Sequence, residues 1–165
     1  MTFRFGKAAA AAMAAGAVLA AGAALAHDVG PAPKTAAGQA AAARHQNFKQ
    51  LGAAFKAIND EARKGSPDPA VLAGAAKKMN LLAGQMGTWF PKGSGAESGV
   101  KTGAKGEIWS DPQSFAAAVQ RLQGATGKLQ QVAVSGDAGA LKAQVQATGG
   151  ACKGCHDKFR TPDKT

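Results

Sequence analysis

Four stretches of this chain repeat one spacing, with apolar or small residues alternately three and four positions apart. They cover residues 41–62, 72–89, 110–133 and 137–159. This spacing is typical of one face of an α-helix, which repeats about every 3.6 residues. No alternating apolar run of useful length is left between the stretches to form a strand. The sequence therefore predicts an all-α fold with four helices of roughly five to seven turns each.

The residues between these stretches predict how the helices are connected. Gly65-Ser66-Pro67 stops the first helix and Pro91 closes the second. Asp111 and Asp137 are candidate N-caps of the third and fourth. Short connections make the first two and the last two helices antiparallel neighbours, whereas residues 90–109 form one long connection rich in Gly, Lys and Ser. We expect an antiparallel four-helix bundle with up-down-up-down topology and left-handed packing.

The only two cysteines of the chain lie in Cys152-Lys153-Gly154-Cys155-His156, close to its C-terminal end. C-x-x-C-H is the attachment signature of c-type haem, in which each thiolate adds to one haem vinyl group and the adjoining imidazole reaches the iron. Cys152 and Cys155 continue the apolar spacing of the last stretch, and His156 follows Cys152 by four residues. The sequence therefore predicts that both thiols point into the bundle, with His156 on the same side and the haem inside.

Three other roles of a paired-cysteine motif fit this sequence less well than haem attachment does. A redox C-x-x-C of the thioredoxin type follows a strand in a βαβ pattern, and no strand is predicted here. A zinc site needs a second pair of ligands, which no further cysteine can supply. A disulfide across two intervening residues closes too small a loop to stabilise much. A haem-free helical interaction protein with a simple redox pair remains the alternative from a different class.

The N-terminus has the pattern of an export signal. Arg4 and Lys7 precede an Ala-rich apolar run that ends at Ala24-Leu25-Ala26, which fits an A-x-A cleavage site. We interpret residues 1–26 as a cleaved signal peptide, the alternative being an uncleaved anchor helix. The mature chain then begins at His27, with a loose leader over residues 27–36 and the haem domain over residues 37–165. Haem attachment needs an extracytoplasmic compartment that manages thiols, so the predicted location is the bacterial periplasm.

The balance of charge is strongly basic, with a formal net charge of +10 for the whole chain. Cleavage after residue 26 removes two of these charges, Arg4 and Lys7. A basic mature protein suits an acidic redox partner protein. Nucleic acid is not expected as a partner, because the lysines are scattered, aromatics are few and Tyr is absent. No further apolar run is long enough to span a bilayer, so no membrane association is expected after signal cleavage.

Several short segments point to one family. The first helix carries Arg44-x-x-x-Phe48-x-x-Leu51-Gly52, and the long connection begins with Trp89-Phe90-Pro91-Lys92-Gly93-Ser94. The third helix is entered through Ile108-Trp109-Ser110-Asp111-Pro112, and the chain closes with Cys155-His156-Asp157-Lys158-Phe159-Arg160. With the haem motif in the last of four helices, the chain resembles the class II cytochromes c, in particular cytochrome c′, over essentially the whole mature sequence.

The resemblance implies one haem c, held through two thioether bonds by Cys152 and Cys155, with His156 as the proximal axial ligand of the iron. Phe48 then faces the other side of the iron. Electron-carrying members of the class, the cytochrome c-556 type, have Met at that position and are six-coordinate. Members called cytochrome c′ have an apolar residue there and a five-coordinate, high-spin iron. Because Phe48 cannot ligate iron, we expect a five-coordinate haem with an apolar distal face.

A free axial position of this kind predicts a gas-binding haem protein. Enzymatic turnover is not expected, because the sequence offers no acid–base pair near the haem except Arg44 and Arg160, and neither is a usable general acid at neutral pH. We expect the protein to bind NO, with CO as a laboratory ligand, and to act in NO detoxification, transport or sensing, with electron transfer as a further possibility. The alternative is a six-coordinate electron carrier of the c-556 type, in which His45, Met79 or Met86 supplies the sixth ligand. An ordinary surface position for His45 and ordinary core positions for both methionines are the simpler interpretations.

The resemblance also implies roles for two arginines and a paired state of the protein. Arg44, one helical turn before Phe48, is expected to contact a haem propionate. Arg160, four residues after His156, is expected beside the proximal imidazole. Family members usually pair through their first two helices, so a homodimer is expected, with Phe55 and Met79 as candidates for close packing there.

Overall fold

The protein is described by a computed structural model that covers residues 33–162. The predicted signal peptide (1–26) and residues 27–32 of the predicted leader lie outside the described residues. Among residues 33–162 the only β pairing is an isolated antiparallel bridge between Ala104 and Arg160, so the all-α prediction is confirmed. The helices are α1 (Ala36–Ala62), α2 (Pro69–Gln85), η1 (Met86–Trp89), η2 (Ala96–Ser98), α3 (Glu107–Ser110), α4 (Pro112–Val132) and α5 (Ala138–Phe159).

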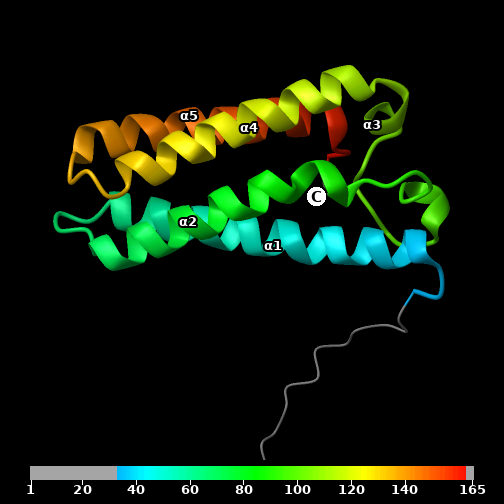
Figure 1. Cartoon of the computed structure of the whole chain (residues 1–165), viewed down its shortest axis with the longest axis horizontal. Helices are drawn as coiled ribbons and strands as arrows, with labels where there is room; N and C mark the ends of the chain where they lie inside the picture. Colours follow the sequence, from blue (N-terminus) through cyan, green and yellow to red (C-terminus); the bar gives the residue numbers. More distant parts are fainter. Residues whose placement is uncertain (1–32, 163–165) are drawn as a thin grey trace, which may run out of the picture. The chain divides into compact units, whose positions relative to one another are not determined.

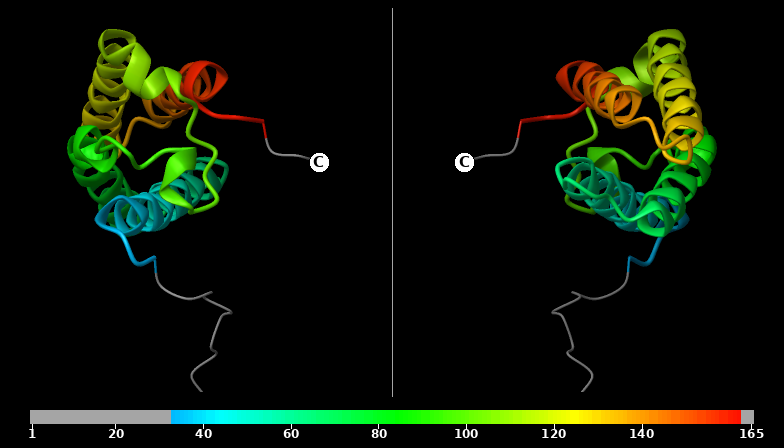
Figure 2. Two further views of the ribbon diagram at one scale, coloured as in Figure 1. Left: turned by 90° about the vertical axis from the view of Figure 1, so that its right-hand side faces the viewer. Right: turned by 90° about the vertical axis from the view of Figure 1, so that its left-hand side faces the viewer.

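The four long helices α1, α2, α4 and α5 form the predicted antiparallel bundle. α1 packs along α2, α4 packs along α5, and α2 packs along α4, whereas α1 and α5 contact each other much less (Figure 1). The end views in Figure 2 show the four helices arranged around a common interior. The prediction missed α3 and η2, which lie inside the long connection and are too short to produce a periodic pattern.

Side-chain caps fix where the long helices begin. The carboxylates of Asp111 and Asp137 accept hydrogen bonds from the backbone N–H groups of Ser114 (3.2 Å) and Ala140 (2.8 Å), as the sequence predicted. Thr35 caps α1 in the same way, so that helix begins at Ala36, earlier than the predicted start at residue 41. Alanine has the highest helix propensity, which allows the Ala-rich segment to join the helix once a cap is present.

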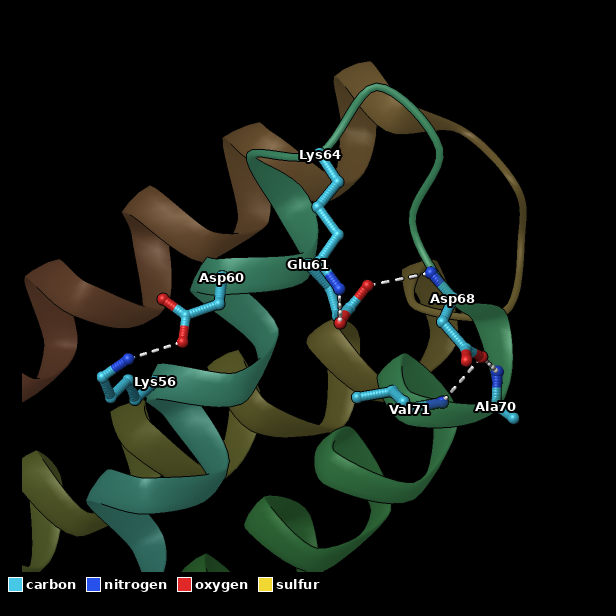
Figure 3. A network of polar contacts seen from close by, with 7 residues as sticks. All are labelled: Lys56, Asp60, Glu61, Lys64, Asp68, Ala70 and Val71. Carbon is cyan, nitrogen blue, oxygen red and sulfur yellow. Dashed lines mark hydrogen bonds and ion pairs between the residues drawn. The ribbon is translucent and has the colours of Figure 1, made fainter.

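A polar network fixes the turn between α1 and α2 (Figure 3). Glu61 lies in the last turn of α1 with only 8% of its side chain exposed, and it accepts a hydrogen bond from the backbone N–H of Asp68 at 2.9 Å. Its other oxygen pairs with Lys64, and these contacts lower the pKa of the Glu61 carboxyl. Asp68 in turn caps α2 by accepting hydrogen bonds from Ala70 and Val71. The acceptor side chains therefore hold both helix ends in a tight antiparallel hairpin.

The bundle interior is apolar along its whole length, and each of the four long helices contributes to it. Its largest fully buried apolar side chains are Ile58 of α1, Met79 of α2, Met86 of η1 and Leu129 of α4. Buried polar side chains of the bundle are hydrogen-bonded, as where Gln144 of α5 donates to the Ala125 carbonyl of α4 at 2.9 Å. No helix among residues 33–162 combines the length and the apolar character needed to cross a membrane.

The long connection packs against the end of α5, next to the haem motif. The Lys105 N–H donates to the Phe159 carbonyl (3.0 Å) and the Thr161 N–H to the Gly103 carbonyl (2.9 Å). Asp111 pairs with Lys158 of α5 at 2.7 Å, and this contact with its N-cap hydrogen bond lowers the pKa of the Asp111 carboxyl to about 2. The connection is therefore a fixed part of the bundle end that carries the predicted haem site.

Candidate functional site

Cys152 and Cys155 lie on the face of α5 that packs against the hydrophobic core. Both are free thiols and both are half-buried. Burial raises the pKa of both thiols, and the neighbouring Cys155 raises that of Cys152 further. The inward orientation predicted from the apolar spacing is therefore observed, and it presents two sulfur atoms from one face of a helix to the bundle interior.

His156 is exposed on α5. It follows Cys152 by four residues and Cys155 by one, and one residue turns an α-helix by about 100°. Its position is therefore about 40° from that of Cys152 and about 100° from that of Cys155, at the edge of the face that carries the thiols. Its placement on the side of the haem and its role as the axial ligand of the iron stay predictions.

A shallow cleft of about 340 Å³ lies beside His156. Its other lining residues are Lys105, Asp157, Arg160, Thr161 and Pro162. Arg160 follows His156 by one helical turn, and its backbone N–H donates to the His156 carbonyl at 3.0 Å. The structure therefore brings the two residues together as expected from their spacing, at an exposed site that the long connection reaches through Lys105.

The face of α1 opposite the haem motif carries Phe48 and Phe55. A Cβ atom added to Gly149 of α5 would lie 3.7 Å from the ring of Phe55, so these two positions face each other. Because α1 and α5 run antiparallel, moving six residues along α5 to Cys155 corresponds to moving six or seven back along α1. Phe48 is therefore level with Cys155 and His156 along the bundle.

Phe48 is half-buried in a cluster of aromatic rings. Its ring meets that of Trp89 edge-on, with 5.2 Å between centroids, and that of Phe90 at 6.2 Å. The row continues through Phe115, whose centroid is 4.7 Å from Phe90 and 5.3 Å from that of Phe159 in the last turn of α5. These edge-to-face contacts are favourable ring geometries. The surroundings of Phe48 are thus aromatic from α1 across to α5.

Arg44 is only 3% exposed, as its place in the apolar spacing predicted. Nη1 donates to the Trp89 carbonyl (3.2 Å) and to the Ser94 hydroxyl (2.9 Å), while Nη2 donates to the Ser94 carbonyl (2.7 Å) and the Thr102 hydroxyl (3.1 Å). Burial lowers the pKa of the guanidinium. All four acceptors are neutral, so a nearby carboxylate would stabilise this buried cation further. The expected contact with a haem propionate stays a prediction.

The three alternative iron ligands lie in different surroundings. Met79 and Met86 are 0% and 1% exposed and belong to the hydrophobic core. His45 is exposed on α1. The surface position expected for His45 and the core positions expected for both methionines are therefore observed.

The residues present fit a covalently attached haem. Two inward thiols three residues apart on α5 supply the attachment atoms, and partly buried apolar side chains packed against the core supply an apolar lining. They include Phe48 and Phe55 of α1, Leu82 of α2, Phe90 after η1 and Ala151 of α5. The chemistry of the donors and the apolar lining are both those of a haem pocket.

A four-helix bundle with C-x-x-C-H on its last helix defines a c-type cytochrome, since this motif serves covalent haem attachment. Cytochrome c′ is one of the standard examples of the up-down-up-down bundle. The family model described as Cytochrome C′ matches residues 39–160 of this chain. The chain belongs to the cytochrome c′ family, and a covalently bound c-type haem is the cofactor that this family implies.

Individual relatives agree with the family. The cytochrome c′ of Pararhodospirillum photometricum is 32% identical over 117 residues, which cover 71% of this chain and 92% of the relative. The cytochrome c′ of Rubrivivax gelatinosus is 47% identical over 68 residues, which are 41% of this chain and 53% of that relative. The chain thus spans about half the length of the latter relative.

Solved structures share the fold. The crystal structure of Rubrivivax gelatinosus cytochrome c′ matches with a TM-score of 0.69 and 35% identity, covering 76% of this chain and 97% of that one. Two variants of cytochrome c prime from Alcaligenes xylosoxidans match with a TM-score of 0.68 and 26% identity, again over 76% of this chain and 97% of theirs. One is a nitric oxide complex and the other has carbon monoxide bound.

Sequence reasoning missed three residues of this site. Ser94 and Thr102 hold the Arg44 guanidinium, and Trp89 packs against Phe48. Ser94 and Thr102 lie in the aperiodic connection, where a hydroxyl residue is common and predicts no contact. The one available signal was Arg44 itself, because a buried arginine needs hydrogen-bond acceptors from some other part of the chain.

Proposed function

We propose that this protein is a periplasmic haem protein whose five-coordinate, high-spin iron binds NO and CO on the side of Phe48. The observation that carries the proposal is Phe48 itself, level with the haem motif on the facing helix and surrounded by Trp89 and Phe90. None of these side chains carries an atom that ligates iron. The gas complexes of the Alcaligenes xylosoxidans variants support the same function for this chain.

The surroundings of Phe48 favour small uncharged ligands. When bound, the haem supplies an iron atom with an open axial position. Phe48, Trp89 and Phe90 exclude water from that side, and their rings give a bound gas little hydrogen bonding. Bound O₂ depends on polar stabilisation more than NO and CO do, so this lining discriminates against O₂.

The second candidate is the six-coordinate electron carrier, in which Met79, Met86 or His45 ligates the iron. The position of Phe48 level with Cys155 and His156 favours the five-coordinate proposal, because its side chain carries no ligand atom. His45 lies on the exposed side of α1. Transfer of single electrons to an acidic partner protein remains compatible with the five-coordinate proposal.

The biological role follows from ligand binding, with no enzymatic turnover. We propose NO detoxification or transport in the periplasm, to which the signal at residues 1–26 exports the chain before it is cleaved. Mass spectrometry of the protein purified from a periplasmic fraction measures the cleavage site and the haem content. A mature mass starting at His27 plus one haem supports the proposal, and a retained N-terminus would contradict it.

A visible spectrum of the ferrous protein tests the iron coordination. The expected spectrum is high-spin, with a broad unsplit Soret band and visible region that change at once when NO or CO is added. Met79→Leu and Met86→Leu should leave this spectrum unchanged, since neither sulfur is assigned to the iron. Sharp low-spin bands that do not respond to CO would contradict this proposal and support the electron carrier. The absence of covalent haem on a denaturing gel would exclude both functions.

The proposal includes a homodimer, but its contacts differ from those first expected. Met79 is fully buried and Phe55 faces Gly149 of α5, so neither is a surface residue for pairing. Leu81 of α2 is 59% exposed and offers an apolar side chain on the outside of the bundle. Sedimentation velocity is expected to show a dimer that Leu81→Lys weakens. A monomer at all concentrations would remove the dimer from the proposal.

A further inference from the structure

Arg44 connects three parts of the long connection to α1. Its four hydrogen bonds reach residues 89, 94 and 102, and its Cζ atom lies 4.7 Å from the centroid of the Phe90 ring. Ser94 is itself fully buried and also donates to the Pro91 carbonyl at 2.7 Å. The guanidinium is thus the centre of a rigid clamp formed by Arg44, Ser94 and Thr102.

The clamp holds the two rings that contact Phe48. Arg44 binds the backbone carbonyl of Trp89 and lies over the ring of Phe90, and these are the two aromatic neighbours of Phe48. Arg44 also precedes Phe48 by one turn of the same helix, so both side chains project toward the same side of α1. Arg44 is therefore placed to act on Phe48 through these two neighbours.

The shape of the guanidinium matters as much as its charge. A planar fork can donate to two carbonyls and two hydroxyls at fixed angles, whereas a lysine ammonium is a single point on a flexible stem. The four acceptors are neutral, so the clamp depends on geometry and not on an ion pair. Loss of the fork would free the Trp89 carbonyl and leave Ser94 with fewer partners.

We propose that Arg44 is a positioning residue for gas binding, which sets the distal wall by fixing Trp89 and Phe90 against Phe48. This inference rests on the proposed function, in which ligands bind on the side of Phe48. It differs from the expected propionate contact, because it acts through side chains of the chain itself. The two roles predict different results when Phe48 is removed.

A double-mutant cycle tests the proposal on the haem-containing protein. CO association with the ferrous form is measured for the natural protein, Arg44→Lys, Phe48→Ala and the double variant. We expect Arg44→Lys to raise the association rate by about tenfold, within the range of couplings between residues that share hydrogen-bond and packing partners. In the Phe48→Ala background the same change should have less than about a twofold effect. Arg63→Lys, an exposed arginine at the end of α1, is the matched control and should change nothing.

An unchanged rate for Arg44→Lys would overturn the proposal. So would an equal fold-change in both backgrounds, because Arg44 would then act by a route that does not include Phe48. If Arg44→Lys does not fold, Thr102→Val and Ser94→Ala each remove one hydroxyl acceptor. They should raise the rate in the same direction by a smaller factor, and unchanged rates for both would count against the clamp.

A crystal structure of the haem-containing Arg44→Lys variant separates this proposal from the proposed function. If the natural protein takes up no CO, the proposed function fails. The positions of the Trp89 and Phe48 rings in the variant then test the positioning role of Arg44 by themselves. Displaced Trp89 and Phe48 rings would support the positioning role. Rings in their original places would refute it.

Discussion

Replacing Phe48 by methionine is expected to convert the iron wholly or partly from five-coordinate high spin to six-coordinate low spin. Position 48 is level with the haem motif on the facing helix, and a thioether there can take the free axial position. A CO molecule must then displace the sulfur. If Met occupies the iron in nine of ten molecules, the apparent CO affinity falls by about tenfold. The visible spectrum and a CO titration of the ferrous protein measure both effects.

Phe48→Leu is the matched control for this experiment. Leucine shortens the side chain and removes the ring but adds no ligand atom, so the spectrum should remain high-spin and CO should still bind. A high-spin spectrum for Phe48→Met that equals that of the leucine variant would show that position 48 does not face the iron. The distal assignment would then have to move to another residue.

Replacing Leu129 by alanine is expected to lower the free energy of unfolding by about 2–5 kcal/mol. Leu129 lies in the last turn of α4 and is 0% exposed, and it belongs to the core built from all the long helices. Removing its branched end takes away buried apolar contacts and leaves a cavity that the neighbouring helices can fill only in part. Urea unfolding of the haem-containing protein, followed by circular dichroism, measures the change.

Val134→Ala is the comparison for the Leu129 experiment. Val134 follows α4 in the turn to α5 and is 65% exposed, so its truncation should change the free energy of unfolding by less than about 0.5 kcal/mol. Equal losses for the two variants would contradict the burial described for Leu129. An altered urea dependence for Leu129→Ala would instead indicate a change in the compactness of one of the two states.

Much of the fold could be predicted because its signals are local. Apolar spacing within each segment predicted the four long helices, and the N-cap residues Asp111 and Asp137 predicted where two of them begin. The same spacing correctly turned Cys152 and Cys155 toward the core. His156 is exposed at the edge of that face, because one residue turns the helix by about 100° from Cys155.

The candidate site likewise has features that are local in sequence and could be predicted, and others that depend on distant residues. Haem attachment is a local property of five consecutive residues, and the resemblance carried by Arg44 and Phe48 indicated what faces the iron. The surroundings of these two residues were not predictable in this way. Ser94 and Thr102 lie 50 and 58 residues from Arg44, in a connection with no periodic pattern, and Trp89 lies 45 residues away at the end of the second periodic stretch.

By itself, then, the sequence determined the covalent haem, the four helices and the absence of a ligating atom at position 48. Only the tertiary structure decided how Arg44 is paired and which rings hold Phe48. The physical reason is that a helical face and a covalent motif depend on neighbours along the chain. A buried cation and a packed ring are satisfied only by groups that folding brings from elsewhere.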